Sequence, residues 1–415
     1  MTKPHNRKPE LVSPVQDWNT LKTVRDLADA IYLGIKNFNM RANAKNFERS
    51  DMNKMMEYCH ERTPPLKVYL ATNILIYDSE LQDLETLLGE AKDAGIDAII
   101  AHDLSVIRFA RRFNLKFHVS TQCNVSNVEA ANFYEELGAE RIVLARELSL
   151  QQIKLIKHHL SRAEIECFVH GSMCTSISGR CYFSATLTDS QEFSANRGNC
   201  TQPCRREWRV IDDQNNELIY DGEMFLNSKD LSMIEHIPEL VDAKIDAFKI
   251  EGRMKDPLYV KTVTECYREA IDSYFSNSYT QEKVKVWIER LSRVFNRGFH
   301  TGFYFQKPTL NDIELNKRGN ISPFKKHYLG KVLLFDEKSK TANVLLESLD
   351  FPLRIGEEII IIGENTYQTE IIKKMTFKCE KIKSIARKRY SDAVKINLRI
   401  EHCEPNDKIY IIAKT

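Results

Sequence analysis

The sequence lacks the long apolar segments that membrane proteins and secreted precursors carry. No run of eighteen apolar residues occurs in the 415 residues, and the first ten, MTKPHNRKPE, do not contain the apolar core of a signal peptide. Mean hydropathy is negative. We therefore expect a soluble, cytoplasmic protein with no membrane partner.

An excess of one charge sign is lacking as well. The chain has 60 Lys and Arg against 58 Asp and Glu, a net charge of +2, which excludes a general polycation. It contains neither a Walker phosphate loop nor the CxxxCxxC triad of radical-SAM proteins. ATP dependence and radical-SAM chemistry are therefore not indicated, and the length suits two or three domains.

The first 250 residues show a rhythm of short apolar runs, most of them followed by amphipathic stretches. Helices are expected at 80–94, 127–137, 150–160 and 257–275, each with a polar cap or a terminal glycine or proline. Eight strands are expected, at 11–14, 30–34, 66–72, 97–102, 116–120, 141–145, 165–170 and 246–251. The pattern predicts an α/β fold, a TIM-like (β/α)₈ barrel, with a doubly wound sheet as the alternative.

The spacing of these strands predicts the domain organisation. Seven strands lie within residues 11–170, and about seventy-five residues precede the eighth, so the barrel of residues 1–276 should carry an insertion at 171–245. Residues 277–324 are polar and then rich in Asn, Gly and Pro, which predicts a connecting segment. Period-two apolar runs in residues 325–415 predict a small C-terminal antiparallel β-barrel.

Four of the ten cysteines cluster inside the predicted insertion: Cys174, Cys181, Cys200 and Cys204. Four thiolates can hold an iron–sulfur cluster or a tetrahedral zinc ion. Zinc ribbons usually pair two CxxC knuckles, which this sequence lacks, so the pattern favours a cluster over zinc. Four unrelated buried thiols are the remaining alternative.

The segments around these cysteines resemble a known family. They are HGSMCTSISGRCYFS at 170–184, NRGNCTQPCRREWR at 196–209, NSKDL at 227–231 and FKIEGR at 248–253. They are similar to the signature of family thirty-two of the unassigned (U) peptidases, the collagenase-like proteases. Phe183 departs from that pattern, since an aliphatic residue is commoner there. The resemblance extends over nearly the whole chain.

The resemblance implies a function that differs from the peptidase name. Members of this family include iron–sulfur proteins that hydroxylate without dioxygen, and the chain's length is most similar to that of the TrhP-type tRNA hydroxylation proteins. By resemblance, the four cysteines would bind a [4Fe-4S] cluster, a uridine at the wobble position of tRNA would become 5-hydroxyuridine, and prephenate would be the oxygen donor. An electron donor of unknown identity is implied too.

Polar residues at the ends of the predicted strands are candidates for a catalytic mouth. Arg146, Lys249 and Arg253 could together hold a carboxylate-bearing cosubstrate, because guanidinium groups pair well with carboxylates. His170 lies four residues before Cys174. We expect His170, Arg146, Glu251 and Arg253 to be catalytic. Other strand-end candidates are Asn39, Arg41, His102, Asp103, His118, Gln122, Cys123 and Glu147.

A basic segment in the C-terminal domain is a candidate RNA-binding surface. Residues 325–415 carry a net charge of +5, whereas residues 1–324 carry −3. Residues 373–389 contain eight basic residues and one acidic residue, with Phe377 inside and Tyr390 beside the run. Phosphate neutralisation with aromatic stacking needs such a mixture, although solvated basic faces are common. We expect Lys373, Lys374, Lys378 and Lys381 to contact tRNA.

Two other functions compete with tRNA hydroxylation. A Cys/His peptidase would need an exposed thiolate of low pKa beside a histidine, and Cys174 near His170 is the candidate pair. An accessory subunit could instead support hydroxylation of rRNA or of quinone precursors, with a related protein as its partner. Activity of one purified chain would separate an enzyme from such a subunit.

Overall fold

The structure is a computed structural model that describes residues 7–218, 224, 226–348, 350–363, 366–386 and 393–414. The chain divides into two compact units. One comprises Met1–Asp17 and Val24–Ile321, and the other comprises Trp18–Thr23 and Ser322–Thr415. None of the described helices is long and apolar enough to cross a membrane.

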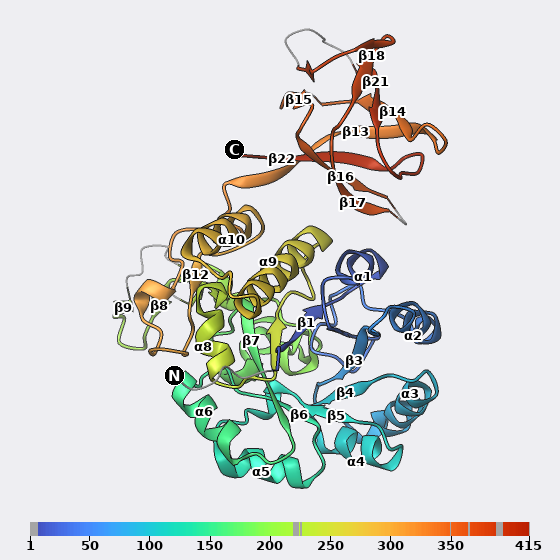
Figure 1. The fold of residues 1–415 in the computed structure, drawn as a ribbon. Helices are drawn as coiled ribbons and strands as arrows, with labels where there is room; N and C mark the ends of the chain where they lie inside the picture. Colours follow the sequence, from blue (N-terminus) through green and yellow to red (C-terminus); the bar gives the residue numbers. More distant parts are fainter. Residues whose placement is uncertain are drawn as a thin grey trace. The chain divides into compact units, whose positions relative to one another are not determined.

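The first unit contains the predicted barrel. Eight parallel strands pair in the order β1–β2–β3–β4–β5–β6–β7–β11, and pairing of β11 with β1 closes the ring (Figure 1). They are β1 (Glu10–Pro14), β2 (Ala30–Leu33), β3 (Lys67–Thr72), β4 (Ala98–Ala101), β5 (Phe117–Val119), β6 (Arg141–Val143), β7 (Glu164–Ser172) and β11 (Ala247–Ile250). The TIM-like prediction is confirmed and the doubly wound alternative is wrong.

Helices surround the ring, and local signals in the sequence set their ends. Ser149 and Asn127 cap helices with their side chains, whereas Gly95 and Gly138 follow helices in left-handed conformations. The surrounding helices are α2 (Met52–His60), α3 (Leu81–Asp93), α4 (Leu104–Arg112), α5 (Val128–Glu136), α6 (Leu150–His159), α8 (Ile237–Asp242), α9 (Pro257–Phe275) and α10 (Gln281–Arg293). Helix α1 (Trp18–Val24) consists mostly of residues assigned to the second unit. The four predicted helices are confirmed to within a residue or two at each end.

The long segment between β7 and β11 forms irregular structure. It contains α7 (Phe183–Thr188), the hairpin of β8 (Val210–Ile211) with β9 (Glu217–Leu218), and β10 (Asp230–Ser232). Strand β10 runs antiparallel to the end of β7 and pairs on its other side with β12 (Phe299–His300). The segment therefore leaves and re-enters the barrel at the carboxyl end of β7.

The second unit is built on an antiparallel sheet, as the sequence predicts. Its eight strands have the order β17–β16–β22–β13–β14–β21–β18–β19, and β15 pairs with β20. They are β13 (Phe324–Asp336), β14 (Thr341–Leu346), β15 (Leu353–Arg354), β16 (Glu358–Ile362), β17 (Tyr367–Ile371), β18 (Met375–Phe377), β19 (Glu380–Lys381), β20 (Ser384–Ile385), β21 (Val394–Arg399) and β22 (Lys408–Lys414). Alternate residues of β14, such as Ala342, Val344 and Leu346, are buried in one apolar core.

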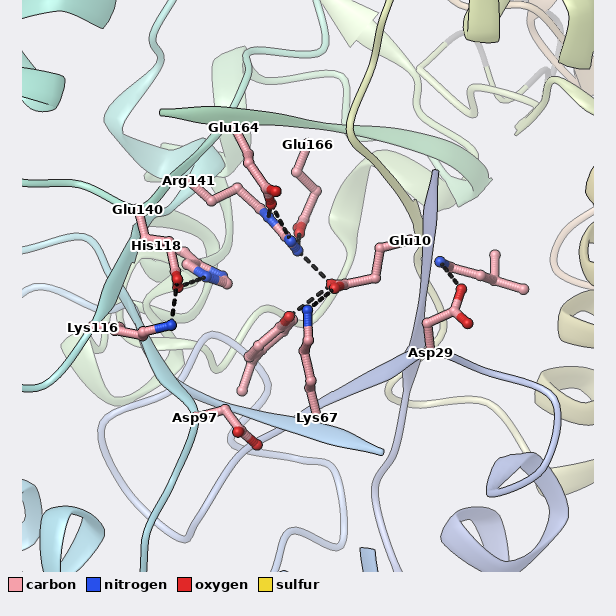
Figure 2. Close-up of polar contacts among 12 residues, drawn as sticks. Glu10, Asp29, Lys67, Asp97, Lys116, His118, Glu140, Arg141, Glu164 and Glu166 are labelled. Carbon is pink, nitrogen blue, oxygen red and sulfur yellow. Dashed lines mark hydrogen bonds and ion pairs between the residues drawn. The ribbon is translucent and has the colours of Figure 1, made fainter. Parts of the chain in front are cut away.

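The interior of the barrel holds a layer of charged residues near the amino ends of the strands (Figure 2). Arg141 Nη1 donates hydrogen bonds to Glu10 Oε1 at 2.6 Å and Glu166 Oε2 at 3.1 Å, and Nη2 donates to Glu164 at 2.6 Å. Lys249 Nζ donates to the other oxygen of Glu166 at 2.5 Å. Buried charges are tolerated only when they are paired, and this layer pairs them.

We predict that Glu10 makes the barrel acid-sensitive. Burial opposes ionisation of Glu10, but Arg141 and Lys67 outweigh it and lower the pKa to about 2 from 4.5. The carboxylate therefore contributes stability that is full above pH 4.5 and is lost as the pH falls through 2. That loss is about 3 kcal/mol for a shift of this size. Urea titrations at several pH values should show that the free energy of unfolding falls less with acid in Glu10→Gln than in the intact chain. The same pH dependence in both proteins would contradict the assignment.

Candidate active site

A hollow opens at the carboxyl ends of the barrel strands. Its cavity volume of about 40 Å³ is room for a few water molecules, so a larger ligand would occupy the open side above this floor. Seven strands or the loops that follow them contribute side chains. The lining residues are Tyr32, Met40, Arg41, Ala71, Asn73, Ile100, Ser120, Thr121, Gln122, Val143, Arg146, Phe168, Lys249, Glu251 and Arg253.

Glu251 is the acidic centre of this hollow. Arg41 donates to Glu251 Oε1 from Nη2 at 3.0 Å and from Nε at 3.3 Å, and Arg146 Nη2 lies 3.9 Å from Oε2. Burial opposes ionisation of the carboxyl, but the charges of Arg41, Arg146 and Arg253 outweigh it and hold its pKa below the ordinary value. Glu251 is therefore a carboxylate at neutral pH, suited to orienting guanidinium groups.

The cations of the hollow exceed its anions. Arg41, Arg146 and Arg253 line the hollow with one carboxylate, Glu251, whereas Lys249 is paired with Glu166 below them. Burial lowers the pKa of Arg253 to about 10 and also lowers the pKa of Lys249. The hollow is therefore suited to an anionic ligand, because such a ligand would offset the surplus charge.

Two guanidinium groups have a donor with no partner. Arg253 Nη2 donates to the side-chain oxygens of Asn39 and Asn46, and Arg146 Nη1 donates to the Ser172 carbonyl at 3.1 Å. The Nε atoms of Arg146 and Arg253 are buried and make no hydrogen bond within the described part of the chain. Because an unpaired buried donor is costly, both atoms indicate an acceptor that the protein itself does not supply.

Lys249 forms the floor beside two aromatic rings. Its Nζ lies 4.2 Å from the centre of the Tyr32 ring and 5.8 Å from that of Phe168, and Arg146 stacks over Phe168 at 4.1 Å. Both rings therefore favour the charged form of Lys249 through cation–π contacts. Tyr32 OH donates to the carbonyl of Ile250 at 2.9 Å, which links β2 to β11.

The segment with the four cysteines packs on the loops of the mouth. Ala42 N donates to the carbonyl of Gly198 at 3.1 Å, and Leu75 N donates to the carbonyl of Asn196 at 3.3 Å. Arg197 pairs with Glu80. Arg205 is buried and donates to Asn227 Oδ1 at 3.0 Å and the Ser228 carbonyl at 2.6 Å. The middle of the segment is therefore anchored to loops of the barrel, and Arg205 anchors its end to the residues that precede β10.

The four thiols lie near enough to influence one another. Burial, together with the neighbouring cysteines, raises the pKa of Cys200 and Cys204, although Arg205 opposes the rise at Cys204. Glu251 is the main cause of the raised pKa of Arg41, to which Cys174 also contributes. Phe183 N and Gln202 N donate to Cys181 Sγ and Cys200 Sγ, each at 3.3 Å. Among the described residues, no group of three or more His, Cys, Asp or Glu side chains is arranged to hold a metal ion. The cluster therefore stays a prediction.

The structure does not bring His170 to the hollow. Its ring lies 5.5 Å from that of Tyr267 on α9, and its Nδ1 is 3.4 Å from the Tyr267 hydroxyl. Burial lowers the pKa of His170 to about 4, so the ring is neutral at physiological pH. His170 thus helps to pack β7 against α9, whereas Arg146, Glu251 and Arg253 do converge on the hollow.

The other strand-end candidates have separate positions. His118 is buried in the lower layer, 3.3 Å from Glu140, and Asp103 caps α4 by accepting from Ser105 N at 2.9 Å. Cys123 Sγ lies 3.9 Å from His102 Nδ1, but burial raises the pKa of the thiol and lowers that of the imidazole. This pair is therefore neutral and poorly suited to nucleophilic attack.

Sequence reasoning missed several residues of the hollow. Asn73 directly follows a predicted strand, so the strand-end rule could have found it. Tyr32 and Phe168 lie inside strands, and only the barrel's closure shows that they face its interior. Ser120 ends a predicted strand and donates to Gln122 Oε1.

The four candidate RNA-binding lysines are exposed on one hairpin and its approach. Lys373 and Lys374 precede β18, Lys378 occupies the turn with a φ of 49°, and Lys381 ends β19. Lys378 Nζ lies 5.5 Å from the centre of the Phe377 ring. Residues 387–392, which include three basic residues of the run and Tyr390, lie outside the described residues.

We predict that Gly198→Ala loosens the cysteine segment. Gly198 has a φ of 84°, and a Cβ there would overlap the Asn39 carbonyl oxygen and lie 3.0 Å from Met40 Cα. Amide exchange at Ala42, which donates to the Gly198 carbonyl, should accelerate about tenfold or more. Gly95→Ala is the matched control, because Gly95 has a φ of 81° and open space around it. Equal exchange at Ala42 in both variants would contradict the packing argument.

Comparisons with known proteins place the chain in a family. An uncharacterized protease of Methanocaldococcus jannaschii is 41% identical over 98% of both chains. A collagenase of Porphyromonas gingivalis is 36% identical over 97% of both. The tRNA hydroxylation protein P1 of Bacillus subtilis is 34% identical over 86% of this chain and 84% of its own. The model of peptidase family U32 matches residues 16–314, and the chain belongs to that family.

Proposed function

We propose that this protein is an RNA-modifying enzyme that hydroxylates a wobble uridine of tRNA to 5-hydroxyuridine. The observation that carries the proposal is the position of the four-cysteine segment on the mouth of a barrel whose hollow has surplus cations. The similarity to a tRNA hydroxylation protein over 86% of this chain supports RNA as the substrate. The site of action would be cytoplasmic, where tRNA is found.

A [4Fe-4S] cluster held by Cys174, Cys181, Cys200 and Cys204 is part of the proposal. Thiols that raise one another's pKa lose their protons together only when a cation balances the negative charge. Backbone N–H groups donate to Cys181 Sγ and Cys200 Sγ, and such bonds stabilise thiolate ligands. A bound cluster supplies one-electron transfer at the mouth, and an external electron donor would be its partner.

Prephenate is the proposed oxygen donor, in place of dioxygen. It carries two carboxylates, and the hollow has buried Nε–H donors on Arg146 and Arg253 without partners among the described residues. Glu251 orients Arg41 and lies near Arg146, so these cations are held in place before any ligand binds. These residues would bind and orient the donor in the hollow.

The RNA base would have to leave its stack to reach the hollow. An unpaired anticodon loop permits this at low cost. The exposed lysines of the β18–β19 hairpin would contact RNA phosphates. Activity of the purified chain alone would show that no partner subunit is needed, and activity only after a related protein is added would show that one is.

Peptide hydrolysis is the second candidate, because two of the relatives are named as a protease and a collagenase. The Cys123–His102 contact does not favour it, since the pKa shifts of both groups keep the pair neutral. A thiol that binds iron is also unavailable as a nucleophile. Peptide turnover by iron-free protein would support hydrolysis over RNA modification.

We predict that Cys174→Ser abolishes both the cluster and the modification. Cells that lack this protein should lose 5-hydroxyuridine and its derivatives from bulk tRNA, as measured by nucleoside mass spectrometry. The intact chain should restore them and Cys174→Ser should not, and the purified variant should lose most of its iron and sulfide. Cys379→Ser, at an exposed cysteine of the other unit, is the matched control and should behave as the intact chain does.

Two results would decide against this proposal. If the intact chain contained no iron after anaerobic purification, the cluster would have no place in the proposal. An unchanged tRNA profile in cells lacking the protein would direct the comparison to rRNA nucleosides and quinone precursors, the substrates of the accessory alternative.

We predict that neutralising Lys373, Lys374, Lys378 and Lys381 to Gln weakens tRNA binding and flattens its salt dependence. Each lost phosphate contact should reduce the slope of log K against log salt by about 0.9 or less. Filter binding at several salt concentrations measures both effects, with the iron content unchanged. Neutralising Lys325, Lys338, Lys395 and Lys408, which are also exposed, removes the same charge as a control. Equal losses in both variants would leave the hairpin without a specific role.

A further inference from the structure

Three polar side chains form a shelf on one side of the hollow. Asn73 follows β3, and Ser120 and Gln122 follow β5. Ser120 is 1% exposed and Gln122 is 8% exposed. Hydrogen bonds among the three side chains hold both residues in one orientation. Among the described contacts, none joins the cations of the hollow to these three side chains. The polar groups of the shelf are therefore not engaged by those cations.

A chain of hydrogen bonds fixes the orientation of the Gln122 amide. The backbone N–H of Met40 donates to Asn73 at 3.1 Å, so the atom that receives it must be Oδ1. Asn73 Nδ2 then points the other way and donates to Gln122 at 3.2 Å, so the receiving atom of Gln122 must be Oε1. The Ser120 hydroxyl donates to the same oxygen. Because a backbone N–H can only donate, neither amide can be reversed without losing these bonds.

The amino group of Gln122 is consequently presented to the hollow as a donor. Its Nε2 points toward Gly179, where a Cβ would lie 3.8 Å away, in the loop between Cys174 and Cys181. Nε2 has no hydrogen-bond acceptor within the described residues, although the side chain is more than nine-tenths buried. A fixed and unused N–H₂ group therefore lies in the lining of the hollow, beside the cysteine segment.

We infer that Gln122 selects uracil over cytosine by donating a hydrogen bond to the exocyclic oxygen at position 4 of the base. Uracil presents an acceptor at position 4, whereas cytosine presents an amino donor there. The exocyclic group at position 4 is adjacent to C5, the carbon that the proposed reaction hydroxylates. A cytosine in the same pose would place two donors against each other and leave both unpaired. This inference rests on the proposed function and names the specificity element of its site.

Gln122 and the guanidinium groups of the hollow suit different ligand atoms. Arg146 and Arg253 carry unpaired Nε–H groups, which suit a carboxylate. Gln122 lies on the side of the cysteine loop and suits a neutral carbonyl. A base held by Gln122 would therefore lie near the cysteine segment.

Binding of three anticodon stem-loop RNAs to the holoprotein tests the inference. The RNAs carry uracil, cytosine or 2-pyrimidinone at the target position, and 2-pyrimidinone has no exocyclic group at position 4. The intact protein should bind the uracil RNA about tenfold to a hundredfold more tightly than the other two. Gln122→Ala should bind all three within about twofold, because the group that distinguishes them is gone. Gln122→Glu should shift the preference toward cytosine, whose amino group can donate to a carboxylate.

Gln151→Ala is the matched control, because Gln151 is exposed on α6 and should leave the preference of the intact protein unchanged. Iron content and the melting temperature of Gln122→Ala show whether the hollow is intact. If Gln122→Ala is folded and still prefers uracil, Gln122 does not read the base and the inference is wrong. If the intact protein neither binds nor hydroxylates any of the RNAs, the proposed function itself is overturned, and the inference with it.

Discussion

Pairing of β7 with β11 is the constraint on which the rest of the site depends. The register sets Ala247 beside Glu166 and Lys249 beside Phe168. This pairing is part of the closed barrel, and it also brings Lys249 of β11 within hydrogen-bond distance of Glu166 of β7. A Cβ at Gly171 would overlap the Glu251 carbonyl oxygen, and its φ of 108° suits glycine. Only a residue without a side chain lets β7 pass this close to Glu251 before the chain turns toward Cys174. Barrel closure, the carboxylate of the hollow and the cysteine segment are therefore one structural unit.

Charge is distributed unequally along the axis of the barrel, and this inequality favours a ligand at one end. In the lower layer, Arg141 and Lys249 share Glu166, and Glu10 adds a second carboxylate to Arg141, so the buried charges are paired. In the hollow at the carboxyl ends of the strands, Arg41, Arg146 and Arg253 outnumber the one carboxylate, Glu251. Removing one of the lower carboxylates would leave a buried cation without its partner, so the lower layer is stable only as a complete set.

The sequence predicts the barrel well because each strand is a short apolar run with its own boundaries. It also predicts that Arg146, Glu251 and Arg253 meet, since carboxyl ends of parallel strands share one face. The same strand-end rule places His170 at the mouth, where the structure does not have it. The register of β7 and β11 shifts between Lys249 and Ile250, and His170 lies against Tyr267 of α9. The charged layer could not be predicted, because Glu10 and Arg141 are far apart in the chain and meet only after the barrel closes. The Gln122 amide likewise depends on a backbone N–H from a different loop.

The relatives carry the names of proteases and of a hydroxylase, and the electrostatics of the cysteines bears on the first of these activities. A nucleophilic cysteine needs a cationic neighbour that lowers its pKa, as an ion-paired histidine does. Here burial raises the pKa of Cys123 and lowers that of His102, while Cys200 and Cys204 are raised by burial and by other thiols. Mutual repulsion of this kind is relieved by a shared cation and not by a single histidine. The raised pKa values of Cys200 and Cys204 therefore do not suit nucleophilic catalysis, and joint coordination by the four thiols stays a proposal.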